Sequence, residues 1–391
     1  MDGNKSYQLK VSVLTPLHVG SDSEKFWQNH VDYYYKESSK TLFVINTKKV
    51  FAALTPRELS DWTAKMTTGK IAEFNQQFFK SNNPEDFSDF DYKIESSPKD
   101  FIRTFTRNGM GKPYIPGSSI KGAIRSALFD HIYHNKNIAN KIGNQFRPND
   151  IEKLAFGDIT NNLMHFLQVF DVQVSQKSMM LLHTKTFNLI EGRGGDWEGG
   201  WKHGDRSDNK FKKDGFVFTY ECLKPVNLKT SLTLTVDSDL IKYKGDKNMN
   251  PEFVDLFQGE DPIRKLFKII NQHTENYIDK EIGFFNNFPN DDGDSEYFSD
   301  LLTELKSRIN SEPEACFLRL GQGSGFHSIT GDWRFENHID TISEPDEKNQ
   351  RRDRNTRENE GTRYKSRKVT FTSDEDGLYF NLLGFIKLTI I

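Results

Sequence analysis

The chain has 391 residues, which suits two or three domains rather than one. Charged residues make up 28% of the chain and aromatic residues 13%, so it is polar but rich enough in rings to fold. Its 53 Lys and Arg against 56 Asp and Glu give a formal net charge of −3. This balance excludes a uniformly basic nucleic-acid binder, but it allows a locally basic groove.

Cysteine usage and hydropathy exclude several further classes. Cys222 and Cys316 stand far apart, so we expect neither a disulfide framework nor a cysteine zinc site. No other group of residues has the spacing of a metal site, and we predict no metal and no cofactor. No window of about 18 apolar residues is present to span a membrane. The first ten residues lack the apolar core of a signal peptide, which favours a cytoplasmic protein.

The first half of the chain combines β-rich runs with segments of helical periodicity. Thr55, Pro56 and Glu58 have the pattern of an N-cap, a first-turn proline and a capping-box glutamate, which predicts a helix start. A polar stretch with two prolines predicts a loop over residues 82–99. The other expected elements are a strand at 7–15, a hairpin at 31–36 and 41–46, helices at 47–54, 56–80 (broken near 69) and 118–134, and a strand at 101–107.

The second half repeats this mixture of strands and helices. Strand and helix signals thus occur in both halves, which predicts two α+β domains, each with helices on one face of a sheet. The expected elements are strands at 165–174, 179–189, 216–222 and 226–236, helices at 251–287 and 295–310, and strands at 316–320, 368–372 and 378–391.

We place the domain division between residues 160 and 161, giving domains 1–160 and 161–391. The first domain carries a helical insertion, and the second a helical insertion at 251–310. Residues 191–213 contain six glycines among charges of both signs and predict an exposed, mobile loop insertion. Residues 344–368 are almost free of apolar side chains and strongly basic. They predict a flexible basic loop, either merely solvated or tracking phosphates.

The strongest local motif is YIPGSSIKGAIR, in which a Pro-Gly turn leads into a helix. Helix N-terminal amides bind phosphate readily, and the hydroxyls of Ser118 and Ser119 would add donors. Lys121 and Arg125 are four residues apart and share one helical face. Residues 99–125 hold six basic residues and one acidic residue, which favours an anion partner. The alternative is an ordinary capped amphipathic helix.

A second motif places three alternate glycines, Gly321, Gly323 and Gly325, after a short strand. Such turns let backbone amides approach phosphates, although neither the P-loop nor the dinucleotide-binding spacing is present. Phe326 and His327 could stack on a base or bond to it. A sheet-edge turn without a ligand is the alternative interpretation.

A third motif, PLHVGS, follows the first strand directly. His18 in this motif could be a general base, an RNA contact or a packing residue, and no partner for catalysis is visible in the sequence.

These three motifs together resemble the RAMP proteins of CRISPR effector complexes. More narrowly, the chain is similar to the family of fifth Csm subunits of type III-A systems. Further stretches that carry the resemblance are VDYYYK, TLFVIN and KKVFAAL in the first half, and FGD followed by LQVFDVQV near the middle.

The resemblance implies a pair of RRM-like, ferredoxin-like βαββαβ domains and a structural, non-enzymatic role in an antiviral ribonucleoprotein. Such a subunit binds the 3′ portion of the crRNA and caps the Csm filament. It contacts the backbone RAMP subunits and the small subunit, and it supports crRNA 3′-end maturation, with host nucleases as further partners. The RNA-binding residues that we infer are His18, Gly20, Ser21, Gly117, Ser118, Ser119, Lys121, Arg125, Gly321, Gly323, Ser324, Gly325, Phe326 and His327.

Two other functions remain open at this point. The first is a Cas6-type crRNA-processing endoribonuclease, metal-independent, with His18 or His327 as general base. The second is the RAMP subunit that holds the crRNA 5′ tag in the same complex. The hairpin pattern over residues 31–54 favours the 3′-end subunit over the 5′-tag subunit.

Overall fold

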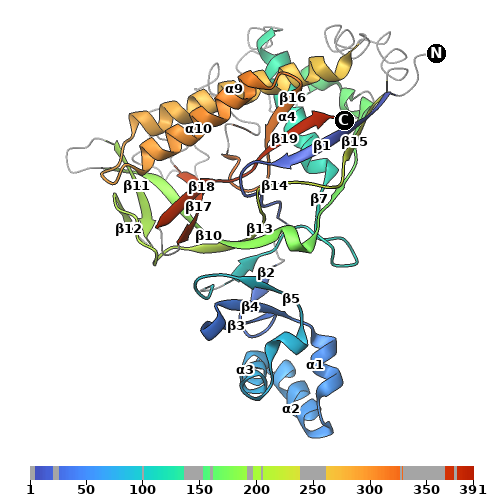
Figure 1. Ribbon diagram of the computed structural model, residues 1–391, viewed down its shortest axis with the longest axis vertical. Coiled ribbons are helices and arrows are strands. Elements are labelled where there is room, and N and C mark those ends of the chain that lie inside the picture. Colours follow the sequence, from blue (N-terminus) through green and yellow to red (C-terminus); the bar gives the residue numbers. More distant parts are fainter. Residues whose placement is uncertain are drawn as a thin grey trace.

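The computed structural model shows a mixed α+β fold, as predicted, with a body built on two sheets and a lobe at one end (Figure 1). The residues that the structure describes are 5–20, 26–98, 101–135, 153–158, 162–191, 197–203, 206–237, 261–325, 328, 366–373 and 377–391.

The first sheet has the strand order β16-β19-β1-β15-β8, and every pairing in it is antiparallel. Central strand β1 buries Leu9 and Val11 and exposes Gln8 and Lys10, because successive side chains of a strand point to opposite faces. The strands of this sheet are β1 (Lys5–Val13), β8 (Leu167–Val169), β14 (Val226–Asn227), β15 (Leu232–Val236), β16 (Ala315–Arg319) and β19 (Phe385–Ile390).

Two helices cover the buried face of the first sheet. Helix α4 (Gly117–Asn135) lies between β1 and β8 in the chain, and α9 (Pro262–Asn287) lies between β15 and β19. Ile124 of α4 and Leu266 of α9 join Val11 in one core. The four strands β19-β1-β15-β8 with these two helices follow a βαββαβ chain order. The predicted division at residue 160 remains a prediction, and this pairing runs across it.

The second sheet has the order β12-β11-β10-β13-β6-β2, with β17 paired to β10 and β18 to β17. Helix α10 (Asp294–Ser311) lies beside α9 (Figure 1) and packs Phe298 and Leu302 into an aromatic core with this sheet. The strands are β2 (Phe26–Gln28), β6 (Phe101–Arg103), β10 (Met179–Glu191), β11 (Trp197–His203), β12 (Arg206–Asp208), β13 (Phe218–Leu223), β17 (Ser366–Ser373) and β18 (Leu378–Leu382).

The prediction of an exposed loop insertion over residues 191–213 is wrong for the described part of that segment. Its residues form β11 and β12, and the Trp201 side chain is fully buried. The indole N–H of Trp201 donates to Asp294 Oδ2 at 2.8 Å. A Cβ on Gly199 would collide with the Phe288 carbonyl oxygen, so this glycine permits close packing rather than a loop.

Most of the predicted basic loop at 344–368 lies outside the described residues, and its last three residues belong to β17. The predicted helices at 251–310 are present as α9 and α10, although residues 251–260 are not described. The C-terminal stretch that we predicted as one strand forms two, β18 and β19, separated by a turn at Gly384.

The lobe (residues 29–98) combines a small sheet, in the order β3-β4-β5, with three helices. The predicted capping box is confirmed, since Thr55 Oγ1 accepts from the Glu58 backbone and Glu58 accepts from the Thr55 backbone. The predicted loop at 82–99 is wrong where β5 adds a strand to the hairpin. The elements are β3 (Tyr33–Lys36), β4 (Thr41–Ile45), β5 (Ser88–Lys93), α1 (Thr47–Ala53), α2 (Pro56–Thr67) and α3 (Ile71–Ser81).

A buried carboxylate joins the lobe to the body. Glu221 of β13 is 0% exposed. Its carboxylate accepts hydrogen bonds from Tyr92 Oη of the lobe at 2.5 Å, from the Phe105 N–H at 2.8 Å and from the Arg107 guanidinium. Gln176 Nε2 donates to Tyr92 Oη at 2.7 Å. Burial and the neighbouring Glu221 charge raise the pKa of Tyr92, so its hydroxyl stays a proton donor.

Replacing Glu221 by Ala should lower the free energy of unfolding by about 3–5 kcal/mol, because the partly buried Arg107 would lose its counter-charge and the Tyr92 hydroxyl and Phe105 N–H would lose their acceptor. Urea unfolding of the full chain, followed by circular dichroism, measures this loss. The matched control is Glu95→Ala, which removes an exposed pair with Lys40 and should cost at most about 1 kcal/mol. Equal losses in the two variants would contradict the role assigned to Glu221.

Candidate nucleic-acid interface

The glycine loop (residues 320–325) packs against the turn that follows β1. The Gln322 N–H donates to the His18 carbonyl oxygen at 2.8 Å. Gly321 has φ +76°, and a Cβ there would collide with the same carbonyl oxygen. The Gly384 N–H donates to the Pro16 carbonyl oxygen at 2.9 Å. Two predicted motifs from opposite ends of the chain therefore meet, because β1 pairs with β19 and β19 pairs with β16.

The His18 side chain points into the protein rather than toward solvent. It is 2% exposed, and its Nδ1 lies 2.7 Å from the Glu221 carbonyl oxygen. A carbonyl oxygen only accepts, so Nδ1 carries the proton. Burial lowers the pKa of His18 to about 4, with further lowering by Arg103 and Lys368, although the bond to Glu221 opposes the shift. A covered, neutral imidazole of this kind holds the turn in place and does not suit the general base of the endoribonuclease alternative.

Two of the predicted loop residues shape the loop from inside. Ser324 is fully buried, and its hydroxyl donates to the Gly321 carbonyl oxygen at 2.6 Å. Gly323 has φ +92° and lies against the Leu383 side chain. Gly325 is exposed, with open space where a Cβ would stand. The predicted contacts Ser21, Phe326 and His327 lie outside the described residues.

The N-terminus of α4 differs from the prediction. The Gly117 N–H donates to Asp171 Oδ1 at 2.8 Å, and a Cβ on Gly117 would collide with the Val169 carbonyl oxygen. This amide is therefore not free to bind phosphate, because a carboxylate of the same chain already occupies the helix N-terminus. Ser118 is exposed, and Ser119 is half-buried.

The two cations of the α4 motif lie on the helix face as predicted, in different surroundings. Lys121 is half-buried, and its partial burial lowers its pKa. The guanidinium carbon of Arg125 lies 5.1 Å from the ring centroid of Phe156.

Hydrogen bonds of backbone and side chains link the α4 motif to the other two. Thr106 Oγ1 donates to the Gly20 carbonyl oxygen at 2.9 Å, and the Tyr114 N–H donates to the Thr106 carbonyl oxygen at 3.1 Å. At the far end of the glycine motif, His273 bridges Asp130 of α4, at 2.7 Å, and the Ser328 carbonyl oxygen, at 3.4 Å. The structure therefore brings the three motifs into one connected region.

Two cations of this region were not among the predicted site residues. Arg103 of β6 is exposed, and its guanidinium carbon lies 5.8 Å from the Tyr220 ring centroid. Lys368 Nζ donates to Tyr220 Oη at 3.1 Å. Burial and, secondarily, Arg103 lower the pKa of Lys368 to about 8. Within the described part of the chain neither cation pairs with a carboxylate, so both can serve an anionic ligand.

The sequence carried only a partial signal for these two residues. Arg103 and Lys368 fall in the two basic stretches, 99–125 and 344–368, but no pattern within one segment indicates that they meet. They do so because β6 pairs with β13 and β17 with β10 in the second sheet.

Comparison with protein-family models finds a match to the RAMP superfamily over residues 10–327. The chain belongs to the RAMP superfamily. Among curated proteins, it is 23% identical over 347 residues to the CRISPR system Cms protein Csm5 of Methanocaldococcus jannaschii, covering 83% of this chain and 72% of that protein. It is 28% identical over 155 residues to the Csm5 protein of Enterococcus italicus, covering 32% of this chain and 43% of that protein.

Solved structures show the same fold for this RAMP protein. A chain of a cryo-EM structure of a Csm-crRNA-target RNA ternary complex aligns with a TM-score of 0.69 and 18% identity, covering 98% of this chain and all (100%) of that one. The crystal structure of T. onnurineus Csm5 aligns with a TM-score of 0.58 and 18% identity, over 96% and 99% of the two chains. The predicted resemblance to the fifth Csm subunit is confirmed by these matches.

Among the described residues, no group of three or more His, Cys, Asp or Glu is placed to hold a metal ion. None of their helices combines the length and the apolar character that a membrane span needs.

The stability of this RAMP protein should fall as the pH drops from about 6.5 to about 4, by about 1.4 kcal/mol per unit from His18. In this pH range His18 is protonated in the unfolded chain but stays neutral in the folded chain. Urea unfolding at pH 7 and pH 5 measures the effect. In the wild type, the free energy of unfolding at pH 7 should exceed that at pH 5 by about 2 kcal/mol on account of His18. This contribution should vanish in a His18→Gln variant and persist in His165→Gln, at an exposed site. An unchanged pH dependence in His18→Gln would contradict this assignment.

Proposed function

We propose that this RAMP protein is the crRNA-binding subunit of a type III-A Csm effector complex, located at the end of the filament that holds the crRNA 3′ portion. The observation that carries the proposal is the meeting of the glycine loop with the His18 turn, beside Arg103 and Lys368, which have no carboxylate partner among the described residues. The similarity to Csm5 proteins supports the assignment to this complex.

The chemistry of the region suits single-stranded RNA. Proteins hold such RNA with cations along the backbone, with glycine segments that approach it closely and with aromatic stacking. Arg103, Lys368 and Lys121 would neutralise phosphates, and Ser118 would donate a hydroxyl. Gly325 would let the RNA backbone pass close to the loop.

The proposed partners are the crRNA, the backbone RAMP subunits, the small subunit and host nucleases that trim the 3′ end, all in the cytoplasm. We assign the first sheet with α4 and α9 to one RRM-like domain, on the basis of its βαββαβ chain order, and the second sheet to the other. Since each sheet contains strands from both sides of residue 160, this assignment replaces the division there. A non-catalytic role agrees with the covered, neutral His18 imidazole.

Replacing Arg103 or Lys368 by Ala should weaken binding of single-stranded crRNA. Each lost phosphate contact should also reduce the slope of log K against log salt by about 0.7. Filter binding over a series of salt concentrations measures both quantities. The matched control is Lys48→Ala, which removes an exposed charge from α1 of the lobe and should change neither. If the two variants behave like Lys48→Ala, the site assignment fails.

Photo-crosslinking tests which crRNA end this subunit holds. In a reconstituted complex, a photoreactive nucleotide near the crRNA 3′ end should crosslink to this chain, and one in the 5′ tag should not. Crosslinking to the 5′ tag alone would favour the 5′-tag subunit. Cleavage of a repeat RNA by the purified chain, abolished by His18→Ala, would favour the endoribonuclease instead.

A further inference from the structure

We propose that Phe26 and Phe101 form a base-stacking platform for single-stranded RNA on the second sheet. This inference rests on the proposed RNA-binding function and extends it to a pair of residues outside all three sequence motifs. It concerns the RNA bases, which would stack on these two rings, rather than the phosphates.

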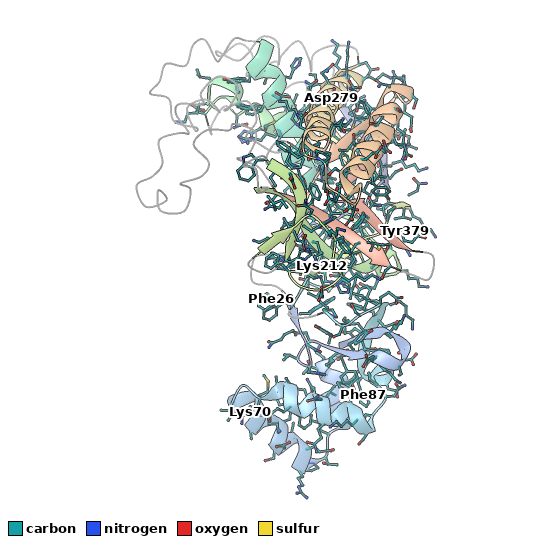
Figure 2. The ribbon with its side chains drawn as sticks, turned by 90° about the vertical axis from the view of Figure 1, so that its left-hand side faces the viewer. Phe26, Lys70, Phe87, Lys212, Asp279 and Tyr379 are labelled. Carbon is teal, nitrogen blue, oxygen red and sulfur yellow. The ribbon has the colours of Figure 1, made fainter. Side chains whose placement is uncertain are left out.

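The two rings lie together at the edge of the second sheet. Strand β2 is the last strand of this sheet and pairs with β6, with Phe26 opposite Arg103. The ring centroids of Phe26 and Phe101 are 4.4 Å apart, yet the residues are 43% and 46% exposed. Figure 2 shows Phe26 at the outer surface, where the lobe joins the body. Two touching rings with this exposure leave ring surface for a further planar group.

The rings share a face of the sheet with the cations Arg103 and Lys368. Phe101 and Arg103 are two residues apart on β6 and therefore point to the same side. In the parallel pairing of β6 with β13, Arg103 lies opposite Tyr220. The Arg103 guanidinium accordingly lies 5.8 Å from the ring centroids of both Phe218 and Tyr220. Lys368 reaches Tyr220 from the other side at 3.1 Å.

This pattern of rings and cations is complementary to RNA in both charge and shape. Aromatic faces stack on bases of any identity, and neighbouring cations bind the phosphates. A nucleotide whose phosphate contacts Arg103 has its base within reach of Phe101, because the two side chains are neighbours on one strand.

Among the described residues, the open face of the first sheet shows no pair of touching exposed rings, although the exposed Phe170 follows β8 at its edge. There β1 and β15 present Gln8, Lys10 and Thr233, and Gln8 Nε2 donates to Thr233 Oγ1 at 3.0 Å. RRM-type sheets bind RNA by stacking bases on strand aromatics. The pair of exposed rings beside two cations lies on the second sheet, so we assign base stacking there.

The test compares single-stranded RNA binding by Phe26→Ala, Phe101→Ala and Phe101→Trp, measured by fluorescence anisotropy. Each Ala variant should weaken binding about 5- to 150-fold, because one stacked base is lost. The salt slope should stay that of the wild type, since no phosphate contact is removed. Phe101→Trp should restore the affinity. The matched control is Phe51→Ala, at a 37% exposed aromatic residue of α1, which should not affect binding.

An oligonucleotide with abasic sites makes the test specific for stacking. Wild type should bind it more weakly than intact RNA, and Phe101→Ala should bind both oligonucleotides equally. Urea unfolding confirms that each variant is folded. Unchanged affinity in folded Ala variants, or a reduced salt slope, would overturn the platform. Normal RNA binding with loss of assembly with other Csm subunits would show a protein contact instead.

The outcomes also separate this inference from the proposed function. If Arg103→Ala reduces the affinity and the salt slope while Phe26→Ala and Phe101→Ala bind like wild type, only the platform fails. If the wild-type chain binds no single-stranded RNA, the proposed function fails and the platform fails with it.

Discussion

One buried carboxylate connects the parts of this protein that are far apart in sequence. Glu221 accepts from Tyr92 of the lobe and from Arg107 through its side chain, and its backbone carbonyl accepts from His18. A buried charge without such donors costs several kcal/mol, so the lobe, the second sheet and the turn after β1 must assemble around it together. In this turn, the His18 carbonyl oxygen accepts a hydrogen bond from the glycine loop. The geometry of the candidate interface therefore depends on Glu221, a fully buried residue.

The second sheet also separates the buried negative charge from the cations. Successive residues of β13 point to opposite faces, so Glu221 is directed toward the lobe and Tyr220 toward Arg103 and Lys368. Arg107 neutralises Glu221 on its own face. The cations on the other face are left without a carboxylate among the described residues. This separation explains how a chain with a net charge of −3 keeps two cations on one face of this sheet without a carboxylate partner among the described residues.

The sequence predicted elements with strong local signals and missed those decided by distant partners. Helical periodicity and the capping box located α2 and α4 within a few residues. Strand β11 was missed because its glycines are typical of loops, whereas Gly199 serves to admit the Phe288 backbone. The Glu221 carboxylate and its Arg107 partner carry no sequence signal, since the two residues meet only through tertiary pairing. Arg103 and Lys368 were missed for the same reason.

The capped N-terminus of α4 limits which groups of this protein can contact RNA. Asp171 satisfies the Gly117 amide, so a phosphate site at this helix end would compete with a carboxylate already in place. In the RNA-binding role that we propose, recognition rests on side-chain cations, the glycine loop and exposed rings such as Phe26 and Phe101. Rings stack on any base, and cations that contact phosphates carry no sequence information, so the proposed contacts depend little on RNA sequence. Such a surface suits a subunit that must hold RNAs of different sequence.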